Sequence, residues 1–134
     1  MGKYFTLKEL IYSATAELKH IDNTPNDAIK RNLEILIEQL DKIRAKYGKP
    51  IYVNSGYRCP ALNKAINGVS NSQHQLGEAV DIDTRCGKEE NQKLYDLIAK
   101  NFEFDQLLWE NKGAWIHFSY RRPNRKMKAN VTQK

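Results

Sequence analysis

The longest regular pattern of apolar and polar positions lies between residues 24 and 50. Apolar side chains recur there at helical spacing, at Ile29, Leu33, Leu36, Ile37, Leu40, Ile43 and Tyr47. Thr24 is a capping residue followed by a proline, which is favoured at the first helical position. Gly48 and Pro50 end the pattern. The spacing therefore predicts an amphipathic helix between Thr24 and Gly48, the longest element of the chain.

Three shorter segments also carry helical signals. Thr6 followed by Glu9 forms a capping box, which predicts a first helix through about Leu18. Residues 60–66 form a candidate short helix. Residues 88–101 predict a helix that buries three apolar side chains, Leu94, Leu97 and Ile98.

The second half of the chain changes to the patterns of β-strands. Strand-forming or alternating residues occur at 51–53, 79–83, 106–110 and 115–120. Residues 67–77 are rich in Asn, Ser and Gly and predict a loop, whereas Asn111-Lys112-Gly113 predicts a hairpin turn between the last two strands. Helices come first and strands mostly later. The expected class is therefore α+β, with helices packed on an antiparallel sheet.

Composition limits the kind of protein. The 134 residues suit one compact domain, and 40% hydrophobic with 28% charged residues is typical of a soluble globular chain. No apolar run approaches the roughly 20 residues that a membrane-spanning helix needs, so we expect no membrane insertion. The N-terminal segment lacks a long apolar stretch and a small-residue cleavage site, so we expect no signal peptide.

The formal net charge of +6 arises at the end of the chain. Residues 121–134 contain no acidic residue and six basic ones, which account for the whole excess of basic over acidic residues in the chain. They are Arg121, Arg122, Arg125, Lys126, Lys128 and Lys134. We therefore divide the chain into one domain at residues 1–120 and a basic C-terminal tail at residues 121–134, expected to be a solvated terminus. Such a tail attracts polyanions weakly. The folded part has no basic face with interleaved aromatic residues, so we expect no specific nucleic-acid binding.

Residue types that bind transition metals are few in this chain. The two cysteines, Cys59 and Cys86, form neither a disulfide framework nor a metal knuckle. Reduced thiols are expected, although a single bridge between them stays open. Of the three histidines, His20 follows the end of the first predicted helix, where an imidazolium favours the helix dipole, so we assign it no chemistry.

The other two histidines are placed to meet one aspartate. His74 lies in the loop directly before the strand that carries Asp81, and His117 lies in the last strand. Two imidazoles and a carboxylate form a three-ligand zinc set with the fourth tetrahedral position open. Zinc lowers the pKa of a water at that position to about 7, which indicates hydrolytic chemistry. By spacing alone, satisfied polar residues or surface residues remain the commoner alternative.

Three motifs resemble those of one enzyme family and occur in the family's order. They are Ser55-Gly56-Tyr57-Arg58, Ser72–Asp81 in the form SxHxxGxAxD, and Trp115-Ile116-His117. The chain resembles a single-domain member of the zinc D-alanyl-D-alanine carboxypeptidase family, which shares its fold with Hedgehog signalling domains and includes many bacteriophage endolysins. The opening YFTLKEL is similar to that of phage and bacterial members as well.

The resemblance implies a role for each matching residue. His74, Asp81 and His117 would bind Zn²⁺, and Arg58 would donate to the oxygen on which charge develops as water attacks a peptide carbonyl. Ser72 would bond a ligand or the terminal carboxylate of the substrate, with a loop cap as an equal alternative. The implied substrates are the stem peptides of peptidoglycan. Removal of terminal D-alanine and internal cleavage both stay open.

One departure from the family pattern affects the general base. Members of the family carry an acidic residue three positions before the last histidine ligand, where this chain has Ala114. Glu110, at the end of the preceding strand, is our preferred base, and Asp105 is the other candidate. The departure also leaves open a catalytically inactive, zinc-containing binding or structural protein of the same fold.

The expected location follows from the wall substrate and the missing signal. A chain of this kind would stay in the cytoplasm until released, as phage-type lysins are, or would reach the cell wall by another route. We expect it to act as a monomer.

Overall fold

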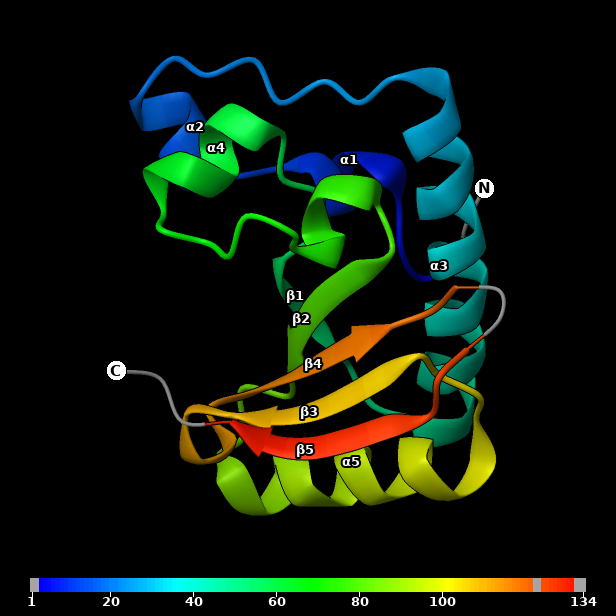
Figure 1. Cartoon of the computed structure of the whole chain (residues 1–134). Helices are drawn as coiled ribbons and strands as arrows, with labels where there is room; N and C mark the ends of the chain where they lie inside the picture. The colour runs from blue at the N-terminus through cyan, green and yellow to red at the C-terminus, as the bar shows by residue number, and fades with distance from the viewer. Residues whose placement is uncertain (1–2, 122–123, 132–134) are drawn as a thin grey trace.

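Five strands form one sheet in the order β1-β2-β4-β3-β5 (Figure 1). The computed structural model describes residues 3–121 and 124–131. Neighbouring strands are antiparallel except β3 and β5, which are parallel. The expected α+β class, with helices packed on a mainly antiparallel sheet, is confirmed. The elements are α1 (Leu7–Ile11), α2 (Ala14–Leu18), α3 (Asp27–Tyr47), β1 (Tyr52–Ser55), α4 (Pro60–Ala65), the 3₁₀ turn η1 (Gln73–Leu76), β2 (Ala79–Asp83), α5 (Lys88–Asn101), β3 (Gln106–Glu110), the 3₁₀ turn η2 (Asn111–Gly113), β4 (Trp115–Ser119) and β5 (Met127–Val131).

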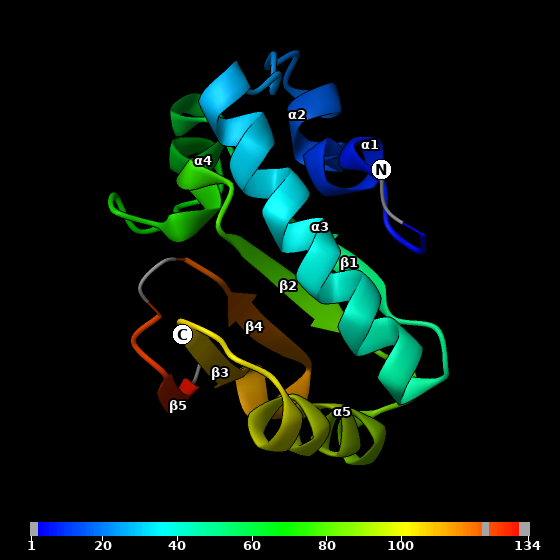
Figure 2. The same cartoon turned by 90° about the vertical axis from the view of Figure 1, so that its right-hand side faces the viewer.

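Helices α3 and α5 lie on the same side of the sheet (Figure 2). The apolar side chains between these helices and the strands are fully buried and include Leu33, Leu36, Leu40, Ile43, Val80, Ile82, Leu94, Ile98, Leu107, Ile116 and Phe118. Side chains alternate between the faces of a strand, so Asp81 and His117, which stand between these apolar residues, point to the other face. The core thus fixes which side of the sheet carries the polar site.

The segments expected at 79–83, 88–101, 106–110 and 115–120 agree with β2, α5, β3 and β4 to within one residue. The first strand was expected at 51–53, whereas β1 begins at Tyr52 and continues through Ser55. Within the described residues, no helix combines the length and the apolar character that crossing a bilayer requires.

Two predicted helix boundaries are wrong. Helix α3 begins two residues later than expected, because the side chain of Asn26 accepts the Ile29 N–H at 2.9 Å and so serves as N-cap. Thr24 instead donates its hydroxyl to Asp22 at 2.6 Å. The first helix is also interrupted, since the Ser13 hydroxyl accepts the Ala16 N–H at 3.1 Å and starts a second helix, α2. Serine hydroxyls compete with the backbone in this way, so the capping box at Thr6 starts a helix of one turn only.

The expectation that residues 121–134 form a solvated basic tail is also corrected, for residues Met127–Val131. Residues Met127–Val131 form β5, which pairs with β3 along its whole length. The Met127 N–H donates to the Asp105 carbonyl at 2.8 Å. This part of the chain therefore belongs to the domain and is not a solvated terminus. Arg121, Lys126 and Lys128 are exposed, so weak polyanion binding stays a prediction, and Arg122 and Lys134 lie outside the described residues.

Both cysteines are free thiols, as expected. Cys59 is buried and caps α4, where its sulfur accepts the Leu62 N–H at 3.4 Å. Cys86 is exposed.

Candidate metal centre

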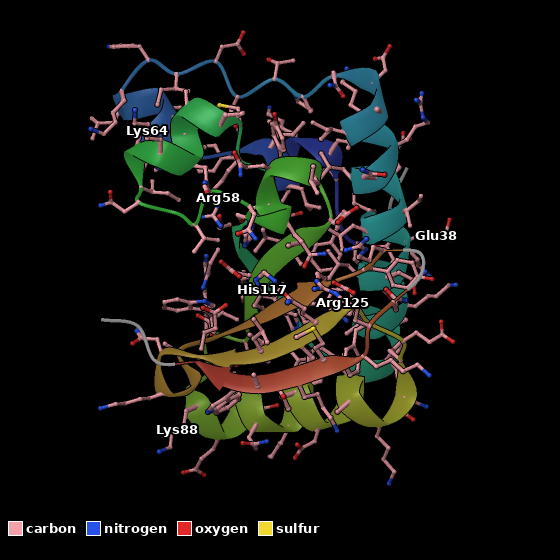
Figure 3. The ribbon with its side chains drawn as sticks, viewed as in Figure 1. Glu38, Arg58, Lys64, Lys88, His117 and Arg125 are labelled. Atoms are coloured by element: carbon pink, nitrogen blue, oxygen red, sulfur yellow. The ribbon has the colours of Figure 1, made fainter. Side chains whose placement is uncertain are left out.

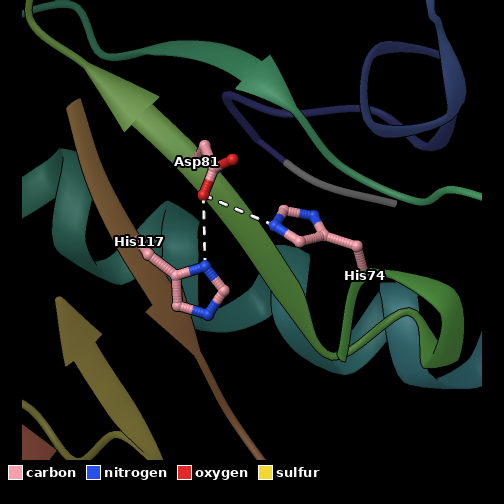
Figure 4. A group of neighbouring side chains, drawn as sticks. All are labelled: His74, Asp81 and His117. Carbon is pink, nitrogen blue, oxygen red and sulfur yellow. Dashed lines mark hydrogen bonds and ion pairs between the residues drawn. The ribbon is translucent and has the colours of Figure 1, made fainter. Parts of the chain in front are cut away.

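Three side chains converge on the face of the sheet opposite α3 and α5: His74, Asp81 and His117 (Figure 4). Asp81 and His117 are Cα partners on β2 and β4, so the strand register places them side by side. Asp81 Oδ1 lies 3.2 Å from His117 Nδ1 and 3.4 Å from His74 Nε2. One potential ligand atom of each residue lies within 4.8 Å of the others, close enough for a metal ion to be shared.

His74 reaches this point from η1, a short turn within the segment expected to be a loop. The Ser72 hydroxyl accepts the His74 N–H at 3.2 Å and caps the turn. Gly77 ends it with φ of 73°. A Cβ atom at Gly77 would lie 2.9 Å from the Ile29 carbonyl oxygen, so the turn can approach α3 only with glycine here. The loop-cap role of Ser72 therefore has a geometric basis, and its contact with a substrate carboxylate stays a prediction.

Hydrogen bonding fixes the tautomer of His74. Its Nδ1 lies 2.7 Å from the Gly56 carbonyl oxygen, which can only accept. Nδ1 therefore carries the proton of the neutral ring, and the lone pair of Nε2 points at Asp81. Such a carbonyl partner is typical of histidine ligands of metals, because it sets the orientation of the ring.

The Asp81 carboxyl stays ionised at neutral pH. Burial alone would raise its pKa, but the positive charge of protonated His74 and His117 and the hydrogen bonds from both rings lower the pKa well below its usual range. His117 faces the Asp81 carboxylate through Nδ1. The buried Nε2 of His117 has no hydrogen-bond partner among the described residues.

These donors fit a metal ion. In the neutral tautomer of His74, a nitrogen lone pair faces an anionic oxygen, an arrangement that a cation between them would satisfy. Two imidazoles with one carboxylate are typical of a transition metal such as Zn²⁺, whereas Mg²⁺ and Ca²⁺ prefer all-oxygen sites. Three protein ligands leave one position of a tetrahedral ion for water or substrate, as in catalytic zinc sites.

The three side chains line a cavity of about 490 Å³, and Arg58 lines it with them. Figure 3 labels Arg58 and His117. The Arg58 N–H donates to the His74 carbonyl at 3.0 Å, and its Nη2 lies 3.4 Å from the Ser72 hydroxyl. Burial lowers the pKa of Arg58, and the charges of Asp81 and Glu110 oppose that shift. Its buried Nε has no hydrogen-bond partner among the described residues. The Arg58 guanidinium therefore lies beside the metal centre and has an N–H donor that makes no hydrogen bond among the described residues.

Only one of the two candidate bases lies at the site. Glu110 ends β3 and lines the cavity, and its Oε2 lies 3.6 Å from His117 Nδ1. Asp105, at the other end of this hairpin, is fully buried and bonds Arg125 and Gln73. The antiparallel hairpin explains the difference, because it pairs β3 with β4 and returns Glu110 to the strand that carries His117. Ala114, at the position where the family carries an acid, follows the η2 turn.

Several cavity-lining residues were not predicted as site residues, among them Gln106, Leu108, Trp115 and Arg125. The alternation of β3 and β4 was sufficient to find Gln106, Leu108 and Trp115, because they share a strand face with Glu110 or His117. No local pattern connects Arg125 with the site. It reaches the cavity only because β5 pairs with β3.

The fold and this site fit a metal-dependent hydrolase, with candidate ligands on one sheet and an adjoining turn. The chain belongs to the Peptidase M15 family, whose sequence model matches residues 3–119. That range contains the three converging side chains, Arg58 and Glu110. No curated protein sequence matches the chain. Membership of this family implies that the protein is a metallopeptidase.

Proposed function

We propose that the protein is a zinc-dependent peptidase that hydrolyses peptide bonds in the stem peptides of peptidoglycan. The convergence of His74, Asp81 and His117 within 4.8 Å, inside a cavity shared with Arg58 and Glu110, carries this proposal. The three motifs that resemble the D-alanyl-D-alanine carboxypeptidase family support the choice of substrate.

In this proposal His74, Asp81 and His117 would hold the metal. A Zn²⁺ ion at this position would supply Lewis acidity toward the scissile carbonyl and the attacking water. The protein supplies the positions of the ligands, which the β2–β4 register and the His74 hydrogen bond to Gly56 hold fixed.

Arg58 stabilises the negative charge that develops on the carbonyl oxygen. Its guanidinium is planar, always charged and restrained beside η1 by the Ser72 hydroxyl. A donor that is already oriented before the reaction stabilises the transition state without reorganisation.

Glu110 acts as general base and acid. Its carboxylate accepts a proton from the attacking water and delivers it to the leaving amine. The distance of 3.6 Å between its Oε2 and His117 Nδ1 places the carboxylate next to the metal centre. This position replaces the acid that family members carry where this chain has Ala114.

The alternative, an inactive zinc-containing binding or structural protein, is favoured by Ala114 alone. Glu110 and Arg58 both line the cavity, an arrangement that a purely structural zinc site does not need. A measurement of peptide hydrolysis distinguishes the peptidase from this inactive alternative.

The test is hydrolysis of defined muropeptides by the zinc-supplemented full-length protein, followed by mass spectrometry of the products. We expect cleavage by the wild type and none by His74→Ala. His20→Asn is the matched control, because His20 is exposed at φ of 56°, a conformation that asparagine tolerates. The identity of the released residue distinguishes carboxypeptidase from endopeptidase action. Zinc binding without cleavage of any muropeptide would overturn the proposal in favour of the alternative.

A further inference from the structure

The C-terminal segment adds a cationic side chain to the cleft from outside the residues that the family model matches. The match ends at Ser119, whereas Arg125 lies between β4 and β5 and lines the cavity with Arg58 and the three converging side chains. In Figure 3, Arg58 and Arg125 lie on different sides of His117. We propose that Arg125 binds a carboxylate of the substrate and that the C-terminal segment thereby sets the specificity of the peptidase. This inference rests on the proposed function.

A buried carboxylate holds Arg125 in place. Asp105 is fully buried, and its Oδ1 accepts the backbone N–H and the Nε–H of Arg125, both at 2.9 Å. Its Oδ2 accepts from Nη2 at 2.7 Å. A bidentate pair of this kind fixes the plane of the guanidinium. The Arg125 side chain nevertheless remains 46% exposed, so it is anchored at one edge and open at the other.

The open edge has donors that the pair with Asp105 does not use. A guanidinium carries five N–H donors in a fixed fork. Asp105 takes one from Nε and one from Nη2, and the Nη1 group has no hydrogen-bond partner among the described residues. An arginine whose orientation is already set loses little conformational freedom on binding, which favours recognition of a second carboxylate.

The same carboxylate connects Arg125 to the metal centre. Gln73 Nε2 donates to Asp105 Oδ2 at 2.9 Å, and Gln73 directly precedes His74 in η1. Asp105 therefore fixes the position of Arg125 relative to the turn that delivers a metal ligand. A substrate carboxylate held by Arg125 would lie at a defined distance from the bond that is cleaved.

The distribution of charges in the cleft favours Arg125 as the residue that binds the substrate carboxylate. Of the residues that the structure describes, two arginines and two carboxylates line the cleft; Asp81 contacts both imidazoles and Glu110 is the proposed base. Arg58 lies within the electrostatic influence of both carboxylates. Arg125 pairs with Asp105, which stands behind it in the core, and the nearby carboxylate of Glu78 also favours its charged form. Stem peptides offer carboxylates of two kinds, at the C-terminus and on D-glutamate.

The experiment compares peptide binding with and without each carboxylate. Zinc-loaded full-length protein carrying Glu110→Gln, which slows turnover, is titrated calorimetrically with a stem tetrapeptide, with its C-terminal amide and with its D-glutamate amide. We expect one amide to bind roughly tenfold more weakly, as loss of a charge-assisted hydrogen-bond pair predicts. The amide that weakens binding identifies the source of the carboxylate. In Arg125→Gln the difference between free acid and amide should fall below about twofold.

Variants separate recognition from folding. Lys128→Gln makes the same change of charge on the same segment, at an exposed residue that does not line the cleft, and should keep the difference between free acid and amide. If thermal unfolding shows that Arg125→Gln does not fold, Arg125→Lys is used instead. Lysine keeps the positive charge but lacks the forked guanidinium, so the difference in affinity between free acid and amide should fall to about threefold.

A full tenfold difference in a folded Arg125 variant, no difference in the parent protein, or no binding of any peptide would overturn the inference. Hydrolysis by the wild type is measured separately, so carboxylate discrimination without cleavage would overturn the proposed function and leave the role of Arg125 standing.

Discussion

Asp81 on β2 and His117 on β4 are direct partners across antiparallel strands, with the carboxylate Oδ1 3.2 Å from the imidazole Nδ1. A shift of one residue in this register would turn one of the two side chains into the core, because strand side chains alternate between faces. Fully buried neighbours on both strands, Val80, Ile82, Ile116 and Phe118, prevent such a shift. The apolar core therefore determines the geometry of the polar site.

Replacing Arg58 should impair turnover and leave the metal centre intact. We expect Arg58→Ala to reduce kcat about 100-fold or more, as loss of an oxyanion donor does, with the zinc content unchanged. Steady-state hydrolysis and elemental analysis measure the two effects. Lys64→Ala is the control, since Lys64 is an exposed cation on the neighbouring helix α4. Equal turnover by the two variants would remove Arg58 from the mechanism.

Replacing Glu110 should separate catalysis from metal binding. Glu110→Gln keeps the shape of the side chain but removes the basic oxygen, so we expect retained zinc and fold with about 100-fold slower hydrolysis or worse. Near-UV circular dichroism and zinc analysis accompany the kinetics. Wild-type rates in this variant would show that another residue takes the proton.

Asp105 should contribute to stability in a pH-dependent way. Burial raises the pKa of its carboxyl, but hydrogen bonds from Arg125 and Gln73 outweigh this effect and hold the pKa at about 2. The unfolded value is about 3.9, so the stabilisation is complete above that pH and is lost as the pH falls toward 2. Urea unfolding of the chelator-treated protein at several pH values should show this decline, and the decline should be smaller in Asp105→Asn. An identical pH dependence in both proteins would contradict the role of this ion pair.

Truncation after Tyr120 should destabilise the domain. The sequence alone predicts that removal of the basic tail leaves hydrolysis of small peptides intact. The structure predicts otherwise, because truncation removes β5 and leaves the buried Asp105 carboxylate without Arg125. Loss of one partner from a fully buried pair costs about 3–5 kcal/mol, and because the Arg125 side chain is partly exposed we expect about the lower value from urea unfolding. A truncated chain as stable as the full chain would show that β5 contributes nothing to the fold.

The sequence was sufficient to predict features that depend on periodicity. The helical spacing between Ile29 and Tyr47 predicted α3, and strand alternation placed Asp81 and His117 on one face. Helix starts were less predictable, because Thr24 and Asn26 are both good caps and only the folded chain decides between them. At Ser13, one hydroxyl was enough to divide a helix.

The C-terminal strand was missed for a different reason. Residues 127–131 do alternate apolar and polar side chains, in the order Met-Lys-Ala-Asn-Val, but the run is short, lies in a basic segment and contains alanine and asparagine, which are uncommon in strands. Their structure comes from parallel pairing with β3 and from a buried carboxylate far away in the sequence. Arg125 precedes this short pattern, and no local signal connects it with the site, which is why it was assigned to a tail.

The central claim is that His74, Asp81 and His117 bind a catalytic zinc ion. Zinc content measured by elemental analysis tests it most directly, on wild type, Asp81→Asn and Asp83→Asn after equal zinc loading and dialysis. Asp83 is the matched control, because it lies on the same strand but accepts from the Arg85 N–H at 2.9 Å and from Asn91 at 3.2 Å. We predict about one zinc per chain in wild type and Asp83→Asn, as expected for one three-ligand site, and almost none in Asp81→Asn. No zinc in the wild type, or equal zinc in all three proteins, would contradict the claim.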